Sequence, residues 1–219
     1  MMVMSSREYQ LACYLTSKRK KTPMNKIESF IVPIMGQAQQ GCGFFIGNYF
    51  VTAGHVIEDS KHPLTVRHEG INYVLDKSKA VKICCSQKLT TDKSDADFAV
   101  FAVDGVKSPL KLANYKPIQG QELCCITYNT VVTKDETPGI PAIFTVREKI
   151  ERIVTTAIVR EETLGNFFAC DTKTILKKGN SGSPLIDAEK RVVGILRGGT
   201  YIPECCIFQF AKIVKDVIV

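Results

Sequence analysis

The sequence has few histidines and no long apolar segment. Only His55, His62 and His68 occur in 219 residues, so a site that uses an imidazole has few candidates. No stretch approaches the roughly 20 apolar residues of a membrane helix, and residues 1–21 lack the apolar core of a signal peptide. We therefore expect a cytoplasmic protein with no membrane partner. The same absences are compatible with a segment released from a viral or bacterial polyprotein.

The spacings typical of metal sites are also missing. No Cys-x-x-Cys or His-x-x-x-His pattern occurs, which leaves zinc a weak alternative and predicts neither a metal nor an organic cofactor. The nine cysteines are an odd number, and adjacent residues on a strand point to opposite faces, which is poor geometry for a mutual disulfide. We expect the adjacent pairs to fill core positions as small hydrophobic residues. These pairs are Cys84-Cys85, Cys124-Cys125 and Cys205-Cys206.

The chain shows no internal repeat and no low-complexity tract, but short β-branched and aromatic runs recur between turn residues. This spacing is typical of an antiparallel sandwich or barrel rather than of βαβ units. A chain of 219 residues can also bury a sizeable core. The expected strands are 26–34, 44–52, 64–66, 80–85, 98–103, 122–133, 142–146, 150–159, 191–196 and 205–210, and helical spacing of apolar residues predicts a short helix over 210–219.

Three distant segments carry the groups needed for acyl transfer. His55 ends the segment Thr52-Ala53-Gly54-His55, and Ser181 lies between glycines in Gly179-Asn180-Ser181-Gly182-Ser183-Pro184. Asp97 opens the apolar run that follows it and can orient the imidazole. Taken singly, each motif has an ordinary structural explanation: a surface turn, a structural histidine or an acid at the start of a strand. Their conjunction favours a catalytic triad.

Few alternatives exist for the base and the carboxylate. His62 and His68 lie in a polar stretch that is typical of a loop or an exposed edge strand, which leaves His55 as the base. Asp92 and Asp95 compete with Asp97 for the carboxylate. Asp95, two residues before Asp97, can point to the same side of a strand and is the second choice.

The order His, Asp, Ser and the flanking residues 41–46, 50–56 and 191–195 resemble trypsin-like serine endopeptidases with the chymotrypsin fold, in particular Deg-type proteases and glutamyl endopeptidases. The resemblance implies an all-β protein of two antiparallel six-stranded β-barrels with a short C-terminal helix. It places a basic N-terminal extension at 1–26 and the protease domain at 27–219. Within that domain we expect a first barrel at about 27–107, a connection at about 108–119, a second barrel at about 120–209 and a helix at about 210–219.

The resemblance also implies roles for individual residues. Ser181 would attack a peptide carbonyl, His55 would accept and return the proton, and Asp97 would hold the ring. The backbone N–H groups of Gly179 and Ser181 would form the oxyanion hole. In secreted trypsins the residue before the serine is an aspartate that pairs with a freed amino terminus. Here it is Asn180, so activation through that salt bridge is not expected.

Substrate preference follows less directly from the resemblance. Ile175 matches the base of the pocket for the residue before the scissile bond, and Arg197, Gly198 and Gly199 match its wall. Ile175 is no counter-ion for a basic side chain, and Leu196 replaces the histidine of glutamyl endopeptidases. Acid selectivity would require Arg197, Lys177 or Lys178 to face the pocket. Otherwise the two glycines leave room for a medium apolar side chain, which we expect.

The formal net charge of +7 admits a second class of function. A catalytically silent protease fold can serve as a binding module that uses a basic surface for a protein or nucleic-acid partner. The lysines are spread along the chain rather than interleaved with aromatic residues, so nucleic acid is not expected as a partner. We therefore expect an enzyme that acts on protein or peptide substrates.

Overall fold

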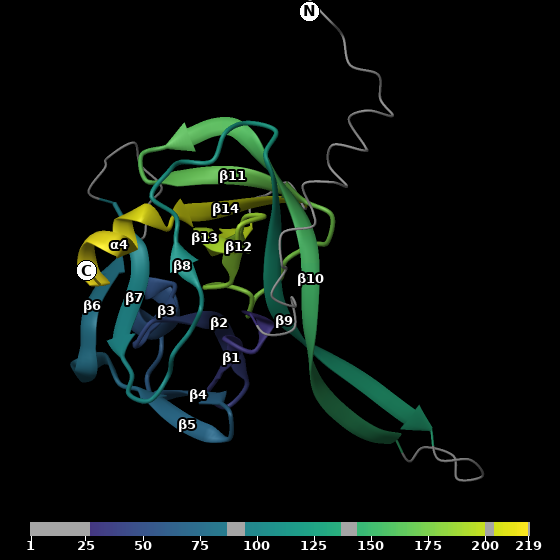
Figure 1. Cartoon of the computed structure of the whole chain (residues 1–219). Helices are drawn as coiled ribbons and strands as arrows, with labels where there is room; N and C mark the ends of the chain where they lie inside the picture. Colours follow the sequence, from purple (N-terminus) through teal and green to yellow (C-terminus); the bar gives the residue numbers. More distant parts are fainter. Residues whose placement is uncertain (1–26, 87–94, 137–143, 200–203, 219) are drawn as a thin grey trace, which may run out of the picture.

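The computed structural model describes residues 27–86, 95–136, 144–199 and 204–218. The expected N-terminal extension and the candidate carboxylate Asp92 lie outside these residues. The described part is built of strands with two short α-helices (Figure 1). None of the helices in these ranges is long and apolar enough to cross a membrane.

The strands of the N-terminal half form one curved sheet. Its order is β5-β4-β1-β2-β3-β7-β6, and every described pairing in it is antiparallel. Within the described residues β5 and β6 are its edges, so the sheet is a half-barrel. The bounds are β1 Ile31–Met35, β2 Gln39–Ile46, β3 Tyr49–Thr52, β4 Leu64–His68, β5 Ile71–Leu75, β6 Ala80–Cys85 and β7 Asp97–Ala102.

The strands of the C-terminal half close into a barrel. The order is β12-β9-β10-β11-β14-β13, and β12 pairs with β13 as well as with β9, which joins the two ends. Strand β8 adds to β13 in parallel. The bounds are β8 Lys111–Leu112, β9 Glu122–Glu136, β10 Phe144–Leu164, β11 Phe167–Thr172, β12 Pro184–Ile186, β13 Arg191–Gly199 and β14 Cys205–Phe210.

These two sheets confirm the all-β, chymotrypsin-like architecture, with differences in detail. One six-stranded barrel is closed, whereas the other sheet has seven strands and stays open among the described pairings. The expected strands at 142–146 and 150–159 belong to one long strand, β10. Phe210 ends β14, so the C-terminal helix α4 (Lys212–Ile218) begins later than expected. The short strand β8 lies inside the expected connection.

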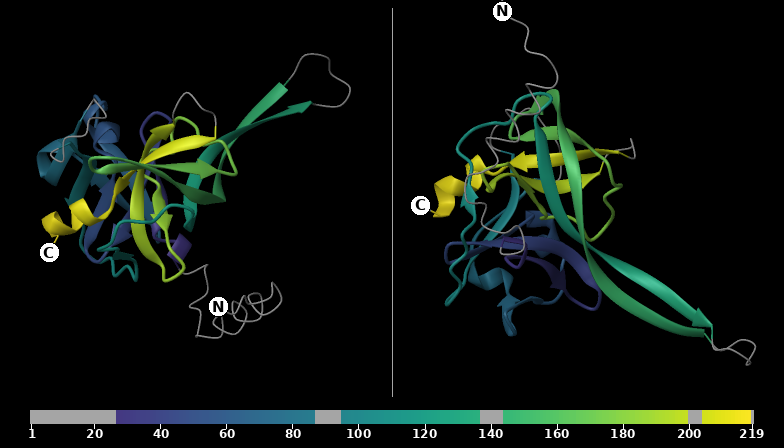
Figure 2. Two further views of the ribbon diagram at one scale, coloured as in Figure 1. Left: turned by 90° about the horizontal axis from the view of Figure 1, so that it is seen from above. Right: turned by 45° about the vertical axis from the view of Figure 1, so that its right-hand side comes forward.

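Strands β9 and β10 form a ribbon that extends well beyond the barrel (Figure 2). Their antiparallel register is regular from Ile158↔Glu122 to Phe144↔Glu136. Near the barrel, residues 123 and 125–127 of β9 are buried, whereas Val132 farther along is 53% exposed. The base of the ribbon therefore belongs to the core, and the rest of it leaves the barrel.

A single large cluster of buried side chains joins the two sheets. It contains Phe44, Phe45 and Phe50 of the first sheet together with Ile126 and Ile195 of the second. Burying each such side chain contributes about 1.5–3 kcal/mol to folding. A second cluster fills the closed barrel, where the rings of Phe168 and Phe210 stack with centroids 4.8 Å apart. The shared cluster fixes the sheets against each other, and the candidate site residues come from both.

Candidate active site

His55 and Asp97 meet because of two paired strands. The short helix α3 (Gly54–Glu58) carries His55 and follows β3, while Asp97 opens β7, and β3 pairs with β7 in the register Thr52↔Ala99. His55 Nδ1 lies 2.7 Å from Asp97 Oδ2, and the backbone N–H of His55 donates to Oδ1 at 2.8 Å. Asp97 is 1% exposed. The carboxylate is therefore held at both oxygens and shielded from water.

The other histidines and acids lie elsewhere. His62 is exposed and lies in a loop. The expectation that His68 is exposed is wrong: it lies in β4, its Nδ1 is 3.0 Å from Ser29 O, and it packs between the rings of Phe30 and Phe45. Its neighbours in sequence are polar, but strand alternation turns its own side chain into the core.

Asp95, the second choice for the carboxylate, does not contact the imidazole. Its Oδ1 instead accepts a hydrogen bond from Ser86 Oγ at 2.9 Å. Asp97 is thus the acid beside His55.

The turn that carries Ser181 packs against the strands that precede His55. The N–H of Cys42 in β2 donates to Ser181 O at 2.7 Å. At the next residue, Gly182, the backbone has φ +89°, and a Cβ there would lie 2.1 Å from Cys42 O and 3.0 Å from the N of Ala53. Only glycine allows this approach. The close contact with Ala53 brings the turn to within a few residues of His55.

Hydrogen bonds to carbonyl groups set the direction of the N–H groups in this turn. The carbonyl of Asn180 accepts from Ser183 N at 3.1 Å, and Ser183 Oγ lies 2.6 Å from the same oxygen. Because a trans peptide directs its C=O and N–H to opposite sides, the N–H of Ser181 points away from Ser183. Among the described residues, neither this N–H nor that of Gly179 donates to a backbone carbonyl.

Arg197 of β13 contacts both halves of the site. Its carbonyl accepts a hydrogen bond from Ser181 Oγ at 3.1 Å. Its Nε lies 3.5 Å from Asp97 Oδ2, and its Nη2 donates to Ser86 O at 2.8 Å. The serine hydroxyl therefore bonds to the backbone of the same residue whose guanidinium lies beside Asp97. One arginine thus contacts both the serine and the carboxylate that holds the imidazole.

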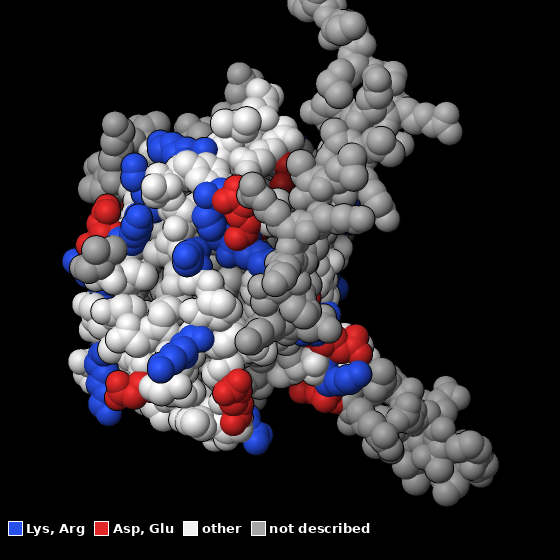
Figure 3. Space-filling model, in the orientation of Figure 1, with Lys and Arg blue, Asp and Glu red and all other residues white. Residues whose placement is uncertain are grey.

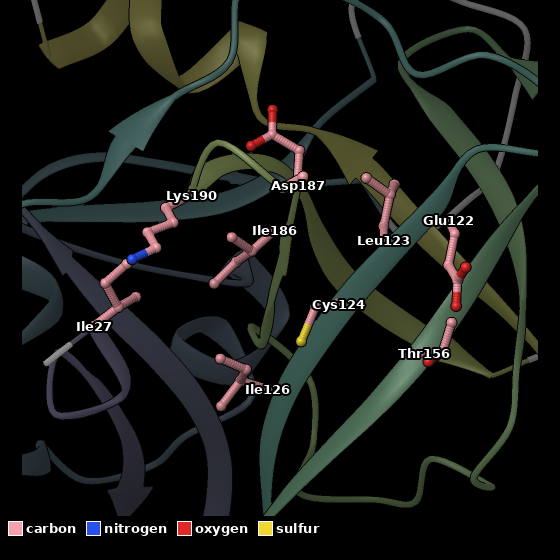
Figure 4. A pocket seen from close by; sticks show the side chains of 10 residues that line it. Ile27, Glu122, Leu123, Cys124, Ile126, Thr156, Ile186, Asp187 and Lys190 are labelled. Atoms are coloured by element: carbon pink, nitrogen blue, oxygen red, sulfur yellow. The ribbon is translucent and has the colours of Figure 1, made fainter. Parts of the chain in front are cut away.

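A hollow of about 330 Å³ opens beside these groups and is lined by His55, Asp59, Cys85, Ser86 and Arg197. A larger hollow of about 520 Å³ lies elsewhere, where Cys124, Ile126 and Ile186 face Ile27 (Figure 4). None of the candidate catalytic side chains lines the larger hollow. Of these two hollows, only the smaller one is lined by a candidate catalytic residue, His55.

A family model for a trypsin-like peptidase domain matches residues 41–195. The match includes both the segment that carries His55 and the segment that carries Ser181. The chain belongs to the trypsin-like peptidase family. It is a serine peptidase of the chymotrypsin fold. A search of curated proteins found no match.

Solved structures similar to this peptidase show the same fold. A mutant of Rv3671c from M. tuberculosis H37Rv, in its inactive form, has a TM-score of 0.58 and 21% identity, over 91% of this chain and 89% of that chain. An inactive tobacco etch virus protease complexed with substrate has a TM-score of 0.55 and 18% identity, over 85% and 79%. The serine protease of a human pathogenic astrovirus has a TM-score of 0.52 and 21% identity, over 84% and 90%.

The residues expected to form the specificity pocket of the peptidase precede and follow the serine turn in the sequence. Ile175 is 51% exposed, and Lys177 and Lys178 are exposed as well. Gly198 and Gly199 end β13, and a Cβ at either would meet nothing within 4 Å. The space beside these two glycines is therefore free of other described atoms.

Two features of the peptidase site have no signal in the sequence. The guanidinium of Arg197, a residue expected in the pocket wall, contacts Asp97 and Ser86. Gln39, in the unremarkable stretch Gln37-Ala38-Gln39-Gln40, reaches the serine turn. Both contacts join residues more than 95 positions apart, and no local pattern predicts a pairing at that distance.

Proposed function

We propose that this peptidase hydrolyses peptide bonds in protein substrates through Ser181, His55 and Asp97 and an acyl-enzyme intermediate. The observation that carries the proposal is the 2.7 Å contact of His55 Nδ1 with a buried carboxylate. A ring held in this way keeps its proton on Nδ1 and leaves Nε2 to accept another. Its partner would be the Ser181 hydroxyl.

The steps follow from these placements. Ser181 Oγ attacks the substrate carbonyl carbon while Nε2 of His55 takes the hydroxyl proton. The carbonyl oxygen becomes an anion, which the N–H groups of Gly179 and Ser181 stabilise. The intermediate then collapses: the bond to the leaving amine breaks, and His55 returns its proton to that nitrogen. Water repeats the sequence on the acyl-enzyme and frees Ser181.

The hydrogen bond from Ser181 Oγ to Arg197 O must open before attack. A turn about χ1 of serine accomplishes this, and such a rotation is fast for an accessible side chain. The same bond is the observation that favours the second candidate, a silent binding module in which the serine stays engaged. Basic and acidic side chains are interspersed on the face in Figure 3, which gives this alternative no single basic patch there.

For specificity, we propose that Ile175, Gly198, Gly199 and the backbone of Arg197 form the pocket for the residue before the scissile bond. The guanidinium of Arg197 is engaged by Asp97 and Ser86, which argues against its use as a counter-ion for an acidic substrate. An apolar side chain of medium size fits this lining best. We also propose a reducing, cytoplasmic setting, because the adjacent cysteines of β6, β9 and β14 are neighbours on a strand, which is poor geometry for a mutual disulfide.

A comparison of cleavage products tests the proposal. The parent and a Ser181→Ala variant are incubated with a denatured proteome, and new amino termini are identified by mass spectrometry. We expect cleavages from the parent alone, most of them after apolar residues of medium size. A parent that produces no more termini than the variant would favour the binding module.

A further inference from the structure

Two side-chain amides, one from the first sheet and one from the serine turn, converge on one backbone carbonyl. Gln39, the first residue of β2, donates from Nε2 to Tyr128 O at 2.7 Å. Asn180, inside the turn, donates from Nδ2 to the same oxygen at 2.6 Å. Tyr128 lies in β9, and its own hydroxyl donates to Ile31 O at 2.8 Å. The two sheets and the turn are therefore tied together at this point.

Gln39 also holds the turn directly. Its Nε2 donates to Gly179 O at 2.8 Å, so both N–H bonds of this amide are used. Its Oε1 accepts from Thr130 Oγ1 at 3.3 Å, which fixes the amide from the other end. Every polar atom of the Gln39 side chain thus has a partner, either in the turn or in β9.

Gly179 needs an outside contact to fix its backbone conformation. Its φ is +95°, a conformation that glycine adopts without cost and can also leave without cost. Its N–H is one of the two proposed oxyanion donors, and the direction of that N–H depends on the torsions of Gly179. The bond from Gln39 fixes the plane of the peptide that follows Gly179. Without it, little in the glycine itself would keep the turn in one conformation.

The inner side of the turn is held by Asn180. Its Oδ1 accepts from Lys177 N at 2.6 Å, and its Nδ2 also donates to Asn129 Oδ1 at 2.7 Å. Asn180 is fully buried and these bonds need no freed amino terminus. Asn180 therefore holds the turn from within the second barrel, and Gln39 holds it from the first sheet.

We propose that Gln39 is a positioning residue for catalysis: it keeps the Gly179 peptide in the conformation that binds the oxyanion. This inference rests on the proposed function, because it assigns Gln39 to the same oxyanion site. Gln39 touches no reacting atom. It acts through Gly179, and through it the first sheet sets the geometry of a turn that belongs to the second.

The test uses two variants of Gln39 and a matched control. Gln39→Ala removes the side chain, and Gln39→Met keeps its length without its donors. Gln40→Ala is the control, because neighbouring Gln40 is exposed and bonds only weakly to Ala38 O at 3.4 Å. Each full-length protein is measured for its rate of labelling by a fluorophosphonate, for kcat and KM on a peptide that the parent cleaves, and for hydrogen exchange of residues 177–183.

We expect both Gln39 variants to be labelled about tenfold more slowly, a smaller loss than the 10²–10³ that follows removal of an oxyanion donor itself. The loss should appear in kcat with KM nearly unchanged, since the oxyanion forms only after binding. Exchange at 177–183 should be faster in both Gln39 variants than in the parent. Gln40→Ala should match the parent in every measurement.

Three results would overturn the inference. Gln39 variants could label and turn over like the parent, they could show no change in exchange at 177–183, or Gln40→Ala could lose as much as they do. If the parent itself is neither labelled nor active, the proposed function fails. In that case hydrogen exchange still decides whether Gln39 holds the turn, because that measurement needs no activity.

Discussion

At the scale of single residues, the site depends on how Asp97 is held. One oxygen accepts from the backbone N–H of His55 and the other contacts the ring of the same residue. The guanidinium of Arg197 lies 3.5 Å from the second oxygen. A carboxylate held in this way can accept the Nδ1 proton of the imidazole and orient the ring toward the serine turn.

Replacing the carboxylate by an amide should therefore impair catalysis while preserving shape. We predict that Asp97→Asn lowers kcat by about 10⁴-fold, the loss typical of this change in serine proteases. Asp95→Asn is the matched control, because Asp95 contacts Ser86 and not the ring. Steady-state kinetics on a cleaved peptide measure both. Equal losses in the two variants would show that Asp97 has no special role.

Gly182 provides a test of the turn itself. A Cβ at this position would lie 2.1 Å from Cys42 O, and the substituted residue would have to keep a backbone φ of +89°. We predict that Gly182→Ala lowers the free energy of unfolding by more than about 2 kcal/mol. At Gly198 a Cβ meets nothing within 4 Å, so Gly198→Ala should change stability by less than about 1 kcal/mol. Urea titration measures both, and similar midpoints would contradict this packing.

The sequence predicts the reactive residue types of the site better than their contacts. Ser181 and His55 lie in short motifs whose residues have local reasons to be there, such as the glycines that open the turn. The contacts of Arg197 with Asp97 and of Gln39 with Gly179 depend on how two sheets are packed. No local sequence pattern predicts that packing, so only the structure shows these contacts.

At the scale of elements, local periodicity predicts the bounds of strands well where burial alternates along the strand or is complete. The bounds of β6 and β14 agree with the expected strands. Strand β12 was not expected, because its three residues are too few to show a period. The length of β10 was also missed, since pairing with β9 extends it through the polar residues 147–149. Tertiary pairing overrides propensity at these places.

The C-terminal helix tests the packing of an element. In α4, Val214 is fully buried in the cluster that joins the two sheets, whereas Lys212 is exposed. We predict that Val214→Ala costs about 2 kcal/mol of stability, the loss of two buried methyl groups and the cavity they leave. Lys212→Ala should cost less than about 0.5 kcal/mol. Thermal or urea unfolding measures the difference, and equal effects would mean that the helix does not dock through this face.

At the scale of the whole molecule, five of the eight described cysteines are buried. Cys42, Cys125 and Cys170 are fully buried, and burial raises the pKa of each thiol above its usual range. Cys85 is partly exposed, and its pKa is raised by burial and by nearby carboxylates, among them Asp97. A raised pKa leaves less thiolate at neutral pH, so each of these thiols should react more slowly than a free cysteine.

We predict that iodoacetamide at neutral pH leaves Cys42, Cys125 and Cys170 unmodified in the folded protein and modifies them only in urea. Cys85 should react in the folded protein, slowly, and faster as the pH rises toward its raised pKa. Peptide mass spectrometry after timed quenching follows each site separately. Rapid alkylation of the three buried thiols without denaturant would contradict the described core.

We propose that two sheets bring one serine, one histidine and one buried aspartate together as a working nucleophile. Treating the parent, Ser181→Ala and His55→Ala with a fluorophosphonate, and mapping the adduct by mass spectrometry, tests this most directly. We expect a single adduct on Ser181 of the parent, none in Ser181→Ala and at most slow labelling in His55→Ala. Cleavage of substrates by a parent whose adduct lies on another residue, or undiminished labelling without His55, would contradict it.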